Sequence, residues 1–111
     1  MDIQRLKRCQ VVPVVALDTP DDALPLADAL MAGGIDIIEL TLRTPNAFAV
    51  VEALKKANHD ILLGVGTVIN TEQVERLAKI GVDFIVTPGT TPRLADAIAA
   101  CNLPCVPGIS T

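Results

Sequence analysis

The sequence DIIELTLRTPNAFAVVEALKK, residues 36–56, contains the pattern that decides the fold. Its first seven residues, 36–42, are mostly isoleucine and leucine, which predicts a strand buried on both faces. Thr44 and Pro45 are typical of the cap and the first residue of a helix. The apolar residues that follow recur at helical spacing: Phe48, Val51 and Leu54. The segment therefore predicts one strand followed by one helix.

The same order of signals recurs along the whole chain. Strands are expected about 20 to 25 residues apart, at 10–17, 36–42, 61–65, 84–86 and 103–107. Helix starts are predicted at residues typical of caps, most of them followed by proline: Thr19-Pro20, Thr44-Pro45, Asn70 or Thr71, and Thr91-Pro92. Glycines are expected to end two helices, at Gly33-Gly34 and Gly81. Strands that alternate with single helices predict right-handed βαβ units and a parallel sheet.

The predicted α/β sheet is part of a (β/α)₈ TIM barrel. A closed barrel has eight strands and usually about 250 residues, whereas these 111 residues provide only about four and a half βα units. A partial barrel has two unpaired strand edges and an apolar sheet face that must be covered. We expect residues 1–111 to be the N-terminal part of a single barrel domain in a longer polypeptide. Pairing with another copy or another segment is the alternative.

Composition and charge exclude several classes of function. A net charge of -4 and a pI near 4.7 argue against nucleic acid as a partner, because phosphate binding needs clustered Lys and Arg. No apolar run reaches the roughly 18 to 20 residues of a membrane span. Cys9, Cys101, Cys105 and His59 do not match metal-ligand spacings, so no metal is expected, and His59 should be solvated. An odd number of cysteines without a signal peptide predicts reduced thiols and a cytoplasmic protein.

Three polar residues stand at every second position in and just after the strand at 36–42: Glu39, Thr41 and Arg43. Side chains two apart in a strand share a face, so these three are expected to project together. An acid for proton transfer beside a cation for a carboxylate or phosphate substrate is one interpretation. A structural ion pair between Glu39 and Arg43 is the other, and the spacing alone does not separate them.

Further residues of chemical interest lie where the other predicted strands end. Reactive groups of parallel barrels collect at the C-terminal ends of the strands. Gly64 and Gly66 would let the backbone approach a small ligand, and Thr67 adds a hydroxyl. Turns that require positive φ are the alternative explanation for these glycines. Pro88-Gly89 and Pro107-Gly108 follow the next two strands.

These strand ends, taken in order, resemble the N-terminal half of the 2-keto-3-deoxy-6-phosphogluconate (KDPG) and 4-hydroxy-2-oxoglutarate (KHG) aldolases. The Glu-x-Thr-x-Arg-Thr and Gly-x-Gly-Thr-Val motifs in this order are specific, whereas each alone is weak. The resemblance covers nearly the whole chain. The residues that carry it are 12–15, 32–35, 38–44, 64–68, 87–89 and 107–111.

The resemblance implies an activity and a set of roles. The family is a homotrimer of (β/α)₈ barrels, and its class I aldolase reaction releases pyruvate from a keto-acid substrate. KDPG gives glyceraldehyde 3-phosphate as the second product, a step of the Entner-Doudoroff pathway, and KHG gives glyoxylate. Carried over by position, Glu39 matches the general acid/base, Arg43 and Thr67 match residues that bind the pyruvyl carboxylate, and Pro88 and Gly89 lie near the same pocket. No cofactor is implied.

The Schiff-base lysine of the family has no counterpart among these residues. Lys7 precedes the first predicted strand, and the other lysines lie on predicted helices. A class I aldolase needs the amine to form its iminium, so residues 1–111 alone are expected to be inactive. Two other hypotheses stay open: a non-catalytic half-barrel that self-associates, and another barrel enzyme that binds a phosphorylated substrate without a Schiff base.

Overall fold

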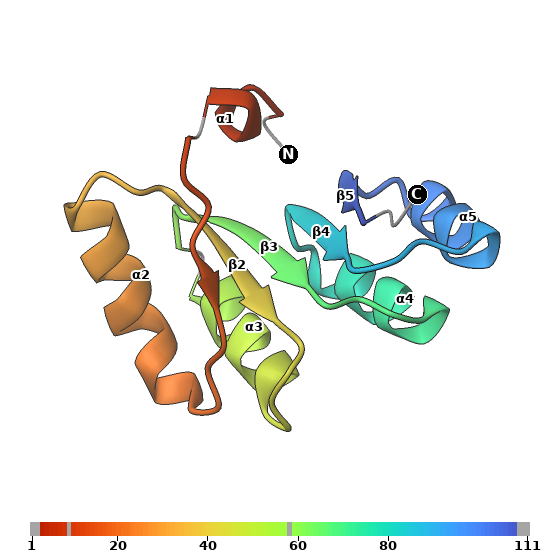
Figure 1. Cartoon of the computed structure of the whole chain (residues 1–111). Helices are drawn as coiled ribbons and strands as arrows, with labels where there is room; N and C mark the ends of the chain where they lie inside the picture. The colour runs from red at the N-terminus through yellow and green to blue at the C-terminus, as the bar shows by residue number, and fades with distance from the viewer. Residues whose placement is uncertain (1–2, 9, 58, 109–111) are drawn as a thin grey trace.

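The computed structural model describes residues 3–8, 10–57 and 59–108, which form one five-stranded parallel sheet in the order β1-β2-β3-β4-β5 (Figure 1). Strands and helices alternate with these bounds: α1 Ile3–Arg8, β1 Val14–Val15, the 3-10 turn η1 Pro20–Asp22, α2 Ala23–Ala32, β2 Ile37–Thr41, α3 Ala47–Lys56, β3 Leu62–Gly66, α4 Thr71–Ile80, β4 Phe84–Thr87, α5 Pro92–Ala100 and β5 Cys105–Pro107. The predicted α/β architecture is confirmed.

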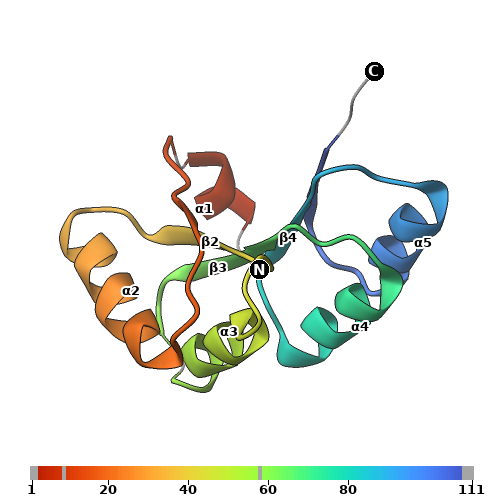
Figure 2. The same cartoon turned by 60° about the horizontal axis from the view of Figure 1, so that its bottom comes forward.

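The sheet is curved and carries its connecting helices on one side. Figure 2 shows α2, α3, α4 and α5 in an arc along that side, with α1 on the other. Neighbouring strands follow the chain order, and all the strand pairs are parallel. Sequential parallel strands with all crossover helices outside are the arrangement of a (β/α)₈ barrel. The described residues form an arc of such a barrel.

Alternation along the strands divides the apolar side chains between the two faces of the sheet. Ile38, Leu40 and Ile85 belong to the large core between the sheet and the helices. Ile37 and Phe84 belong to a smaller cluster on the opposite face, which we call the inner face. Successive side chains of a strand point to opposite faces, so Glu39 lies on the inner face with Ile37.

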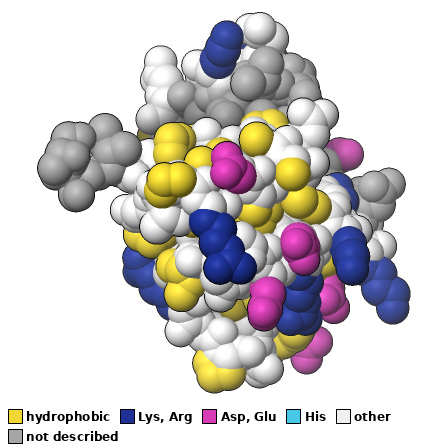
Figure 3. Space-filling model, turned by 90° about the vertical axis from the view of Figure 1, so that its right-hand side faces the viewer, with side chains coloured by type: hydrophobic (Ala, Val, Ile, Leu, Met, Phe, Trp, Pro, Cys, Tyr) yellow, Lys and Arg dark blue, Asp and Glu magenta, His cyan; other side chains and the backbone are white. Residues whose placement is uncertain are grey.

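Part of the inner face and both sheet edges are open. Val14 in β1 is 58% exposed and Val106 in β5 is 47% exposed, although both are apolar. Each stands beside an inner-face residue in the register, Val14 beside Glu39 and Val106 beside Val86. Figure 3, which faces the side of the molecule on the right of Figure 1, shows hydrophobic side chains exposed among charged ones. Apolar surface is therefore left uncovered on both edge strands.

Two predicted helix starts are confirmed in detail. Asn70 Oδ1 accepts a hydrogen bond from the Gln73 N–H at 2.9 Å, and Gln73 Oε1 accepts one from the Ile69 N–H at 2.8 Å. Thr91 caps α5 by accepting from a backbone N–H of its first turn at 3.2 Å. Gly81 ends α4 with a φ of 88°, in the left-handed region that glycine adopts most easily.

Of the two other predicted caps, one is wrong and one is right in position only. Thr44 does not cap α3, which begins after Asn46; its hydroxyl donates instead to the Leu17 carbonyl at 2.8 Å. Thr19 stands at the N-cap position before Pro20, as predicted, but its side chain makes no capping bond, and the first turn is the 3-10 turn η1 ahead of α2. In the first case a neighbouring loop competes for the hydroxyl, and the sequence gives no sign of that contact.

The first strand is much shorter than the predicted range 10–17. Only β1 pairs with β2, and Pro13, just before it, has no N–H to extend the ladder. Beyond this point, side-chain hydroxyls replace ladder hydrogen bonds, since Thr41 donates to the Val15 carbonyl at 3.3 Å. Helix α1 was not predicted because its six residues are too few to show a helical period. Cys9 and the motif residues 109–111 lie outside the described residues.

Two further classes of feature are absent from the described part of the chain. No helix there is long and apolar enough to cross a membrane. No group of three or more His, Cys, Asp or Glu side chains in the same residues has the geometry to hold a metal ion. Cys101 and Cys105 are free thiols.

Candidate active site

The candidate site lies at the C-terminal ends of β2 and β3, where the arrowheads of the two strands point in Figure 1. Glu39 is the central residue of β2, and Thr67 follows the last residue of β3. Arg43 stands in the turn between β2 and α3. The predicted residues of these two strand ends therefore belong to adjacent connections of one sheet.

The carboxylate of Glu39 lies over the backbone of Gly66. A Cβ atom built on Gly66 would overlap Glu39 Oε2, so the carboxylate fills the space that a side chain there would need. Glu39 itself pairs with Gly64 in the register, which means that its side chain leans toward the C-terminal end of the sheet. The Glu39 side chain crosses from β2 onto β3.

Glu39 is half-buried, and its carboxylate has no hydrogen-bond partner among the described residues. Burial raises the pKa of the Glu39 carboxyl above its ordinary value, and the positive charge of Arg43 offsets part of the rise. A carboxyl group with a raised pKa is a better proton donor near neutral pH than an ordinary glutamate. The geometry therefore suits a general acid/base.

Arg43 is exposed and does not form a structural ion pair with Glu39. The ion pairs among the described residues are Arg5–Asp36, His59–Asp28 and Arg76–Glu52. Arg43 acts on Glu39 only through its charge, and its guanidinium stays available to an incoming anion. The structural ion-pair interpretation fails on this point.

The turn that carries Arg43 is fixed to the loop after β1. Asn46 donates its backbone N–H to Asp18 Oδ1 at 3.2 Å and its side-chain N–H to the Asp18 carbonyl at 3.0 Å. The Thr44 hydroxyl adds its bond to Leu17. Hydrogen bonds on the C-terminal side of Arg43 therefore limit the movement of its backbone.

Thr41 has a structural task. It is 2% exposed, and its hydroxyl donates to the carbonyl of Val15 in the neighbouring strand. Of the three polar residues at alternate positions, Glu39, Thr41 and Arg43, the middle one thus supports the short edge strand. The outer two remain free for a ligand.

Thr67 adopts a backbone conformation that is rare for its type. Its φ is 60°, in the left-handed region, and it is one of only two non-glycine residues with positive φ in the described chain. A β-branched residue there is strained, and such strain is concentrated at ligand sites. Thr67 is half-buried, and its hydroxyl has no partner among the described residues. A polar group is thereby held directly after Gly66.

Pro88 and Gly89 form an exposed turn after β4. The Thr87 hydroxyl lies 2.7 Å from that of Thr90 and accepts the Gly108 N–H at 3.2 Å, so the turn is closed on itself and joined to the end of β5. A Cβ on Gly89 would meet no atom within 4 Å, which leaves open space in front of this turn.

Every lysine of the sequence lies within the described residues, and none lies at the C-terminal end of a strand. Lys7 is in α1, Lys55 and Lys56 are in the last turn of α3, and Lys79 is in the last turn of α4. All are exposed. Among the described residues, no lysine amine lies beside Glu39.

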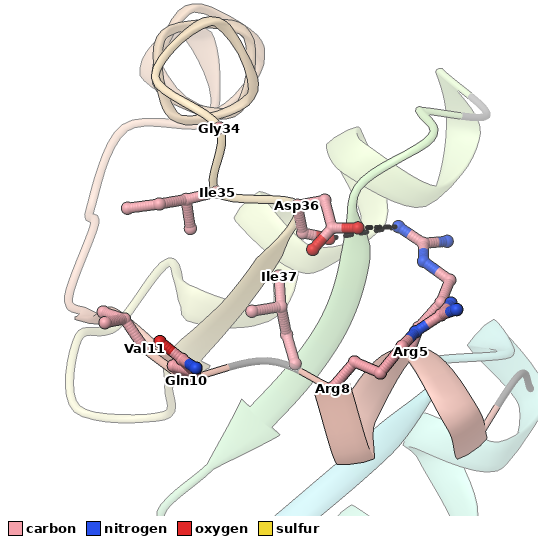
Figure 4. Close-up of a pocket in the computed structure, with 8 residues that line it drawn as sticks. All are labelled: Arg5, Arg8, Gln10, Val11, Gly34, Ile35, Asp36 and Ile37. Carbon is pink, nitrogen blue, oxygen red and sulfur yellow. Dashed lines mark hydrogen bonds and ion pairs between the residues drawn. The ribbon is translucent and has the colours of Figure 1, made fainter.

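The opposite end of the sheet is built differently. A hollow of about 330 Å³ lies between α1 and the start of β2. Figure 4 shows the residues that line it, which include Arg5 and Asp36. The Arg5 guanidinium donates to the Asp36 carbonyl at 3.2 Å and the Asp60 carbonyl at 3.1 Å, and it pairs with the Asp36 carboxylate. These bonds attach α1 to the starts of β2 and β3.

His59 also lies at this end, and the prediction that it is solvated is wrong. Its side chain is 14% exposed, and its Nε2 is 2.7 Å from Asp28 Oδ1 in α2. Its Nδ1 accepts the Ile61 N–H at 3.1 Å. His59 therefore fixes the loop before β3 to a neighbouring helix, far along the strands from Glu39.

Comparison with known proteins supplies the family. The family model for KDPG and KHG aldolases matches residues 3–111. The chain belongs to this family. It is 39% identical over 108 residues to the 2-dehydro-3-deoxy-phosphogluconate aldolase of Haemophilus influenzae, a match that covers 97% of this chain and 51% of the relative. The chain spans about half the length of the curated relatives it matches.

Solved structures of KDPG aldolases have the same fold. The chain matches the Legionella pneumophila enzyme, which holds pyruvate as a covalent carbinolamine intermediate, with a TM-score of 0.85 and 41% identity, covering 90% of this chain and 48% of that one. It matches the Zymomonas mobilis ZM4 enzyme with 3-phosphoglycerate at a TM-score of 0.88 and 34% identity, covering 99% and 53%. The resemblance read from the motifs is confirmed.

Some features of the site were not predicted from the sequence. The contact between the Glu39 carboxylate and Gly66 joins two strands, and its only sequence signal is a strand with glycine at two alternate positions, 64 and 66. The left-handed backbone of Thr67 has no sequence signal, because glycine or asparagine usually marks this conformation. The bonds between Asp18 and Asn46 join loops far apart in the chain.

Proposed function

We propose that this protein is a class I aldolase that cleaves KDPG to pyruvate and glyceraldehyde 3-phosphate, and KHG to pyruvate and glyoxylate. The observation that carries the proposal is the Glu39 carboxyl. It is half-buried, has a raised pKa, and lacks a hydrogen-bond partner among the described residues, although it stands on a rigid strand. A structural role would leave such a group paired.

In the proposed mechanism, Glu39 moves protons at the reacting carbon atoms. As the acid, it protonates the carbinolamine hydroxyl, which leaves as water; as the base, it accepts a proton during carbon–carbon cleavage. Arg43 and Thr67 bind the pyruvyl carboxylate, the first through its planar guanidinium and the second through its hydroxyl. Pro88 and Gly89 border the same space. Membership of the family supports this assignment.

The mechanism requires an amine as electron sink. The four lysines of the sequence are exposed on helices, so we propose that the Schiff-base lysine comes from outside residues 1–111. Residues 1–111 would then be the N-terminal part of a single (β/α)₈ domain. The open inner face and the extent of the matches to KDPG aldolases support this. No metal or organic cofactor takes part.

Assembly and location complete the proposal. We infer a homotrimer, as the family implies, and a cytoplasmic protein, which the free thiols Cys101 and Cys105 support. Phosphorylated and unphosphorylated keto acids are both included among the substrates, because the family model names KDPG and KHG aldolases together.

Borohydride trapping tests the proposal. The intact protein, incubated with pyruvate and sodium borohydride, should gain the mass of one reduced pyruvyl group per chain, and peptide mapping should place it on a lysine outside residues 1–111. Residues 1–111 expressed alone should stay unlabelled, as should the intact protein treated without pyruvate. An intact protein that stays unlabelled, or labelling of a helix lysine within 1–111, would contradict the proposal.

One observation favours a second function, a non-catalytic half-barrel that self-associates. Val14 and Val106 expose apolar surface at the two edge strands, 58% and 47% of each residue, which another copy would cover. This hypothesis expects a stable symmetric dimer of residues 1–111 in sedimentation, together with no borohydride labelling of the intact protein. Labelling of the intact protein excludes it as the main function.

A further inference from the structure

Two glycines stand at successive inner-face positions of β3. A Cβ on Gly64 would overlap the ring of Phe84 from β4, and a Cβ on Gly66 would overlap the carboxylate of Glu39 from β2. The strands on either side thus each place one side chain over β3. At Gly64 and Gly66 the inner surface of β3 consists of backbone, and one side chain from each neighbouring strand covers it there.

We propose that Gly66 is a positioning residue for Glu39, because the side chain it lacks leaves the space that holds the acid/base carboxylate. This inference rests on the proposed function, in which Glu39 carries protons. The carboxylate accepts no hydrogen bond from the described residues, so its packing over Gly66 is the contact that places it. Gly66 would act through Glu39 and would not itself contact the reacting atoms.

The residues beside Glu39 restrict where its carboxylate can lie along the sheet. Phe84 already occupies the space over Gly64, the residue beside Glu39 in the register. Val14 flanks Glu39 on the β1 side. Alternate residues of a strand are about 7 Å apart, so the space over Gly66 is the next one along β3 toward its C-terminal end. Phe84 and Gly66 together thus direct the carboxylate to the end of the sheet where substrates of barrels bind.

Backbone conformation does not explain why Gly66 is a glycine. Gly66 pairs with Thr41 inside the parallel ladder, and the glycines with positive φ in the described chain are Gly34 and Gly81. The turn residue with positive φ at this strand end is Thr67, which is not glycine. Residue 66 is therefore glycine because the Glu39 carboxylate needs the space, and not because a turn requires positive φ.

Few of the described residues around Glu39 are charged, so a change in its pKa would report a change in the position of its carboxylate. Val14 from β1, the two glycines of β3 and Phe84 from β4 do not titrate. Arg43, on the turn after β2, is the charged residue that acts on the carboxyl. A displaced carboxylate would regain water, so its pKa would fall toward the ordinary value.

The test is Gly66→Ala in the intact protein. We expect kcat to fall by about 10- to 100-fold, the loss typical of a catalytic group misplaced by about 1 Å, and the acidic limb of the pH profile to move to lower pH. In an E39Q background, G66A should lower kcat no further. Equal loss in both backgrounds, or an unmoved acidic limb, would overturn the inference.

The matched control is Gly64→Ala on the same face of the same strand. Its methyl group collides with the Phe84 ring and not with Glu39, and the space over residue 64 stays filled, so the loss it causes should be as large in E39Q as in the parent protein. Coupling of G64A to E39Q as strong as that of G66A would contradict the inference.

A readout without catalysis separates this inference from the proposed function. NMR titration of the Glu39 carboxyl should show its pKa lowered by G66A even if the protein never cleaves KDPG, and an unchanged pKa would overturn the inference. If G66A does not fold, E39A should restore folding of the double variant, because it removes the colliding group. If the G66A/E39A double variant also fails to fold, this role of Gly66 is ruled out. Borohydride labelling of the parent protein would still test whether it is a class I aldolase.

Discussion

The two ends of the sheet differ because the C-terminal end, which also has paired side chains such as Thr41 and Thr44, leaves three polar side chains without a partner in the described part of the chain. At the N-terminal end, Arg5 bonds to Asp36 and Asp60, and His59 pairs with Asp28. The Asp83 carboxylate there accepts the Leu63 N–H at 2.8 Å. At the C-terminal end, the functional groups of Glu39, Arg43 and Thr67 have no hydrogen-bond partner among the described residues.

The contrast separates groups that stabilise the fold from groups kept for a ligand. Paired side chains at the N-terminal end join α1 to the strands and a loop to α2, and their removal should cost stability. Unpaired groups at the C-terminal end contribute little to the fold, and burial of Glu39 even opposes it. Parallel barrels place catalysis and stability at these same two ends.

Glu39→Gln in the intact protein should give the largest effect. Turnover should fall by about 10² to 10⁴-fold, because the amide keeps the shape but cannot transfer a proton. Steady-state cleavage of KDPG measures it, with Glu52→Gln on the exposed surface of α3 as the control. Unchanged turnover would mean that Glu39 has a structural role, like the paired side chains at the N-terminal end, and the contrast between the two ends would be lost.

Arg43→Lys should weaken carboxylate binding. Loss of the planar two-point contact should raise KM for the keto acid by about 10- to 100-fold, since a hydrogen bond to a charged group contributes about 1.5–3 kcal/mol. The kcat value should change less. The control is Arg93→Lys, exposed at the start of α5. If both variants raise KM equally, Arg43 does not bind the substrate carboxylate.

Arg5→Gln tests the other end of the comparison. The Arg5 side chain is 29% exposed and bridges α1 to two strand starts, so its loss should lower the free energy of unfolding by about 1–2 kcal/mol. Turnover of the folded protein should not change. Urea unfolding of the intact protein measures the loss, with Arg8→Gln, also in α1 but exposed, as the control. A loss of turnover without loss of stability would reverse the assignment.

The smallest effect concerns pH. The pKa of Glu39 is raised in the folded protein, so the folded state holds its proton more tightly than the unfolded state. Stability from this group is present below the unfolded pKa and is lost as the pH rises through the folded pKa. E39Q should therefore be slightly more stable than the parent at neutral pH, and the gain should disappear in acid. Thermal unfolding across pH measures it; a gain that grows in acid would mean that burial does not dominate.

Sequence reasoning was most successful where neighbours in the chain decide the structure. The caps at Asn70 and Thr91 and the helix end at Gly81 were predicted because each depends on residues within one turn. Thr44 was predicted wrongly, because its hydroxyl bonds to Leu17, which is distant in sequence. The residues proposed for the candidate site were named from the sequence, but their contacts were not predicted.

The sequence by itself determined the alternation of strands and helices, the parallel order of the sheet, and the family motifs around Glu39 and Thr67. Those follow from local propensity and from the rule that sequential βα units wind in one direction. Only the tertiary structure decided that Thr41 supports the edge strand while Glu39 lies over Gly66. The physical reason is that space and hydrogen-bond partners on a sheet come from neighbouring strands, which are far apart along the chain.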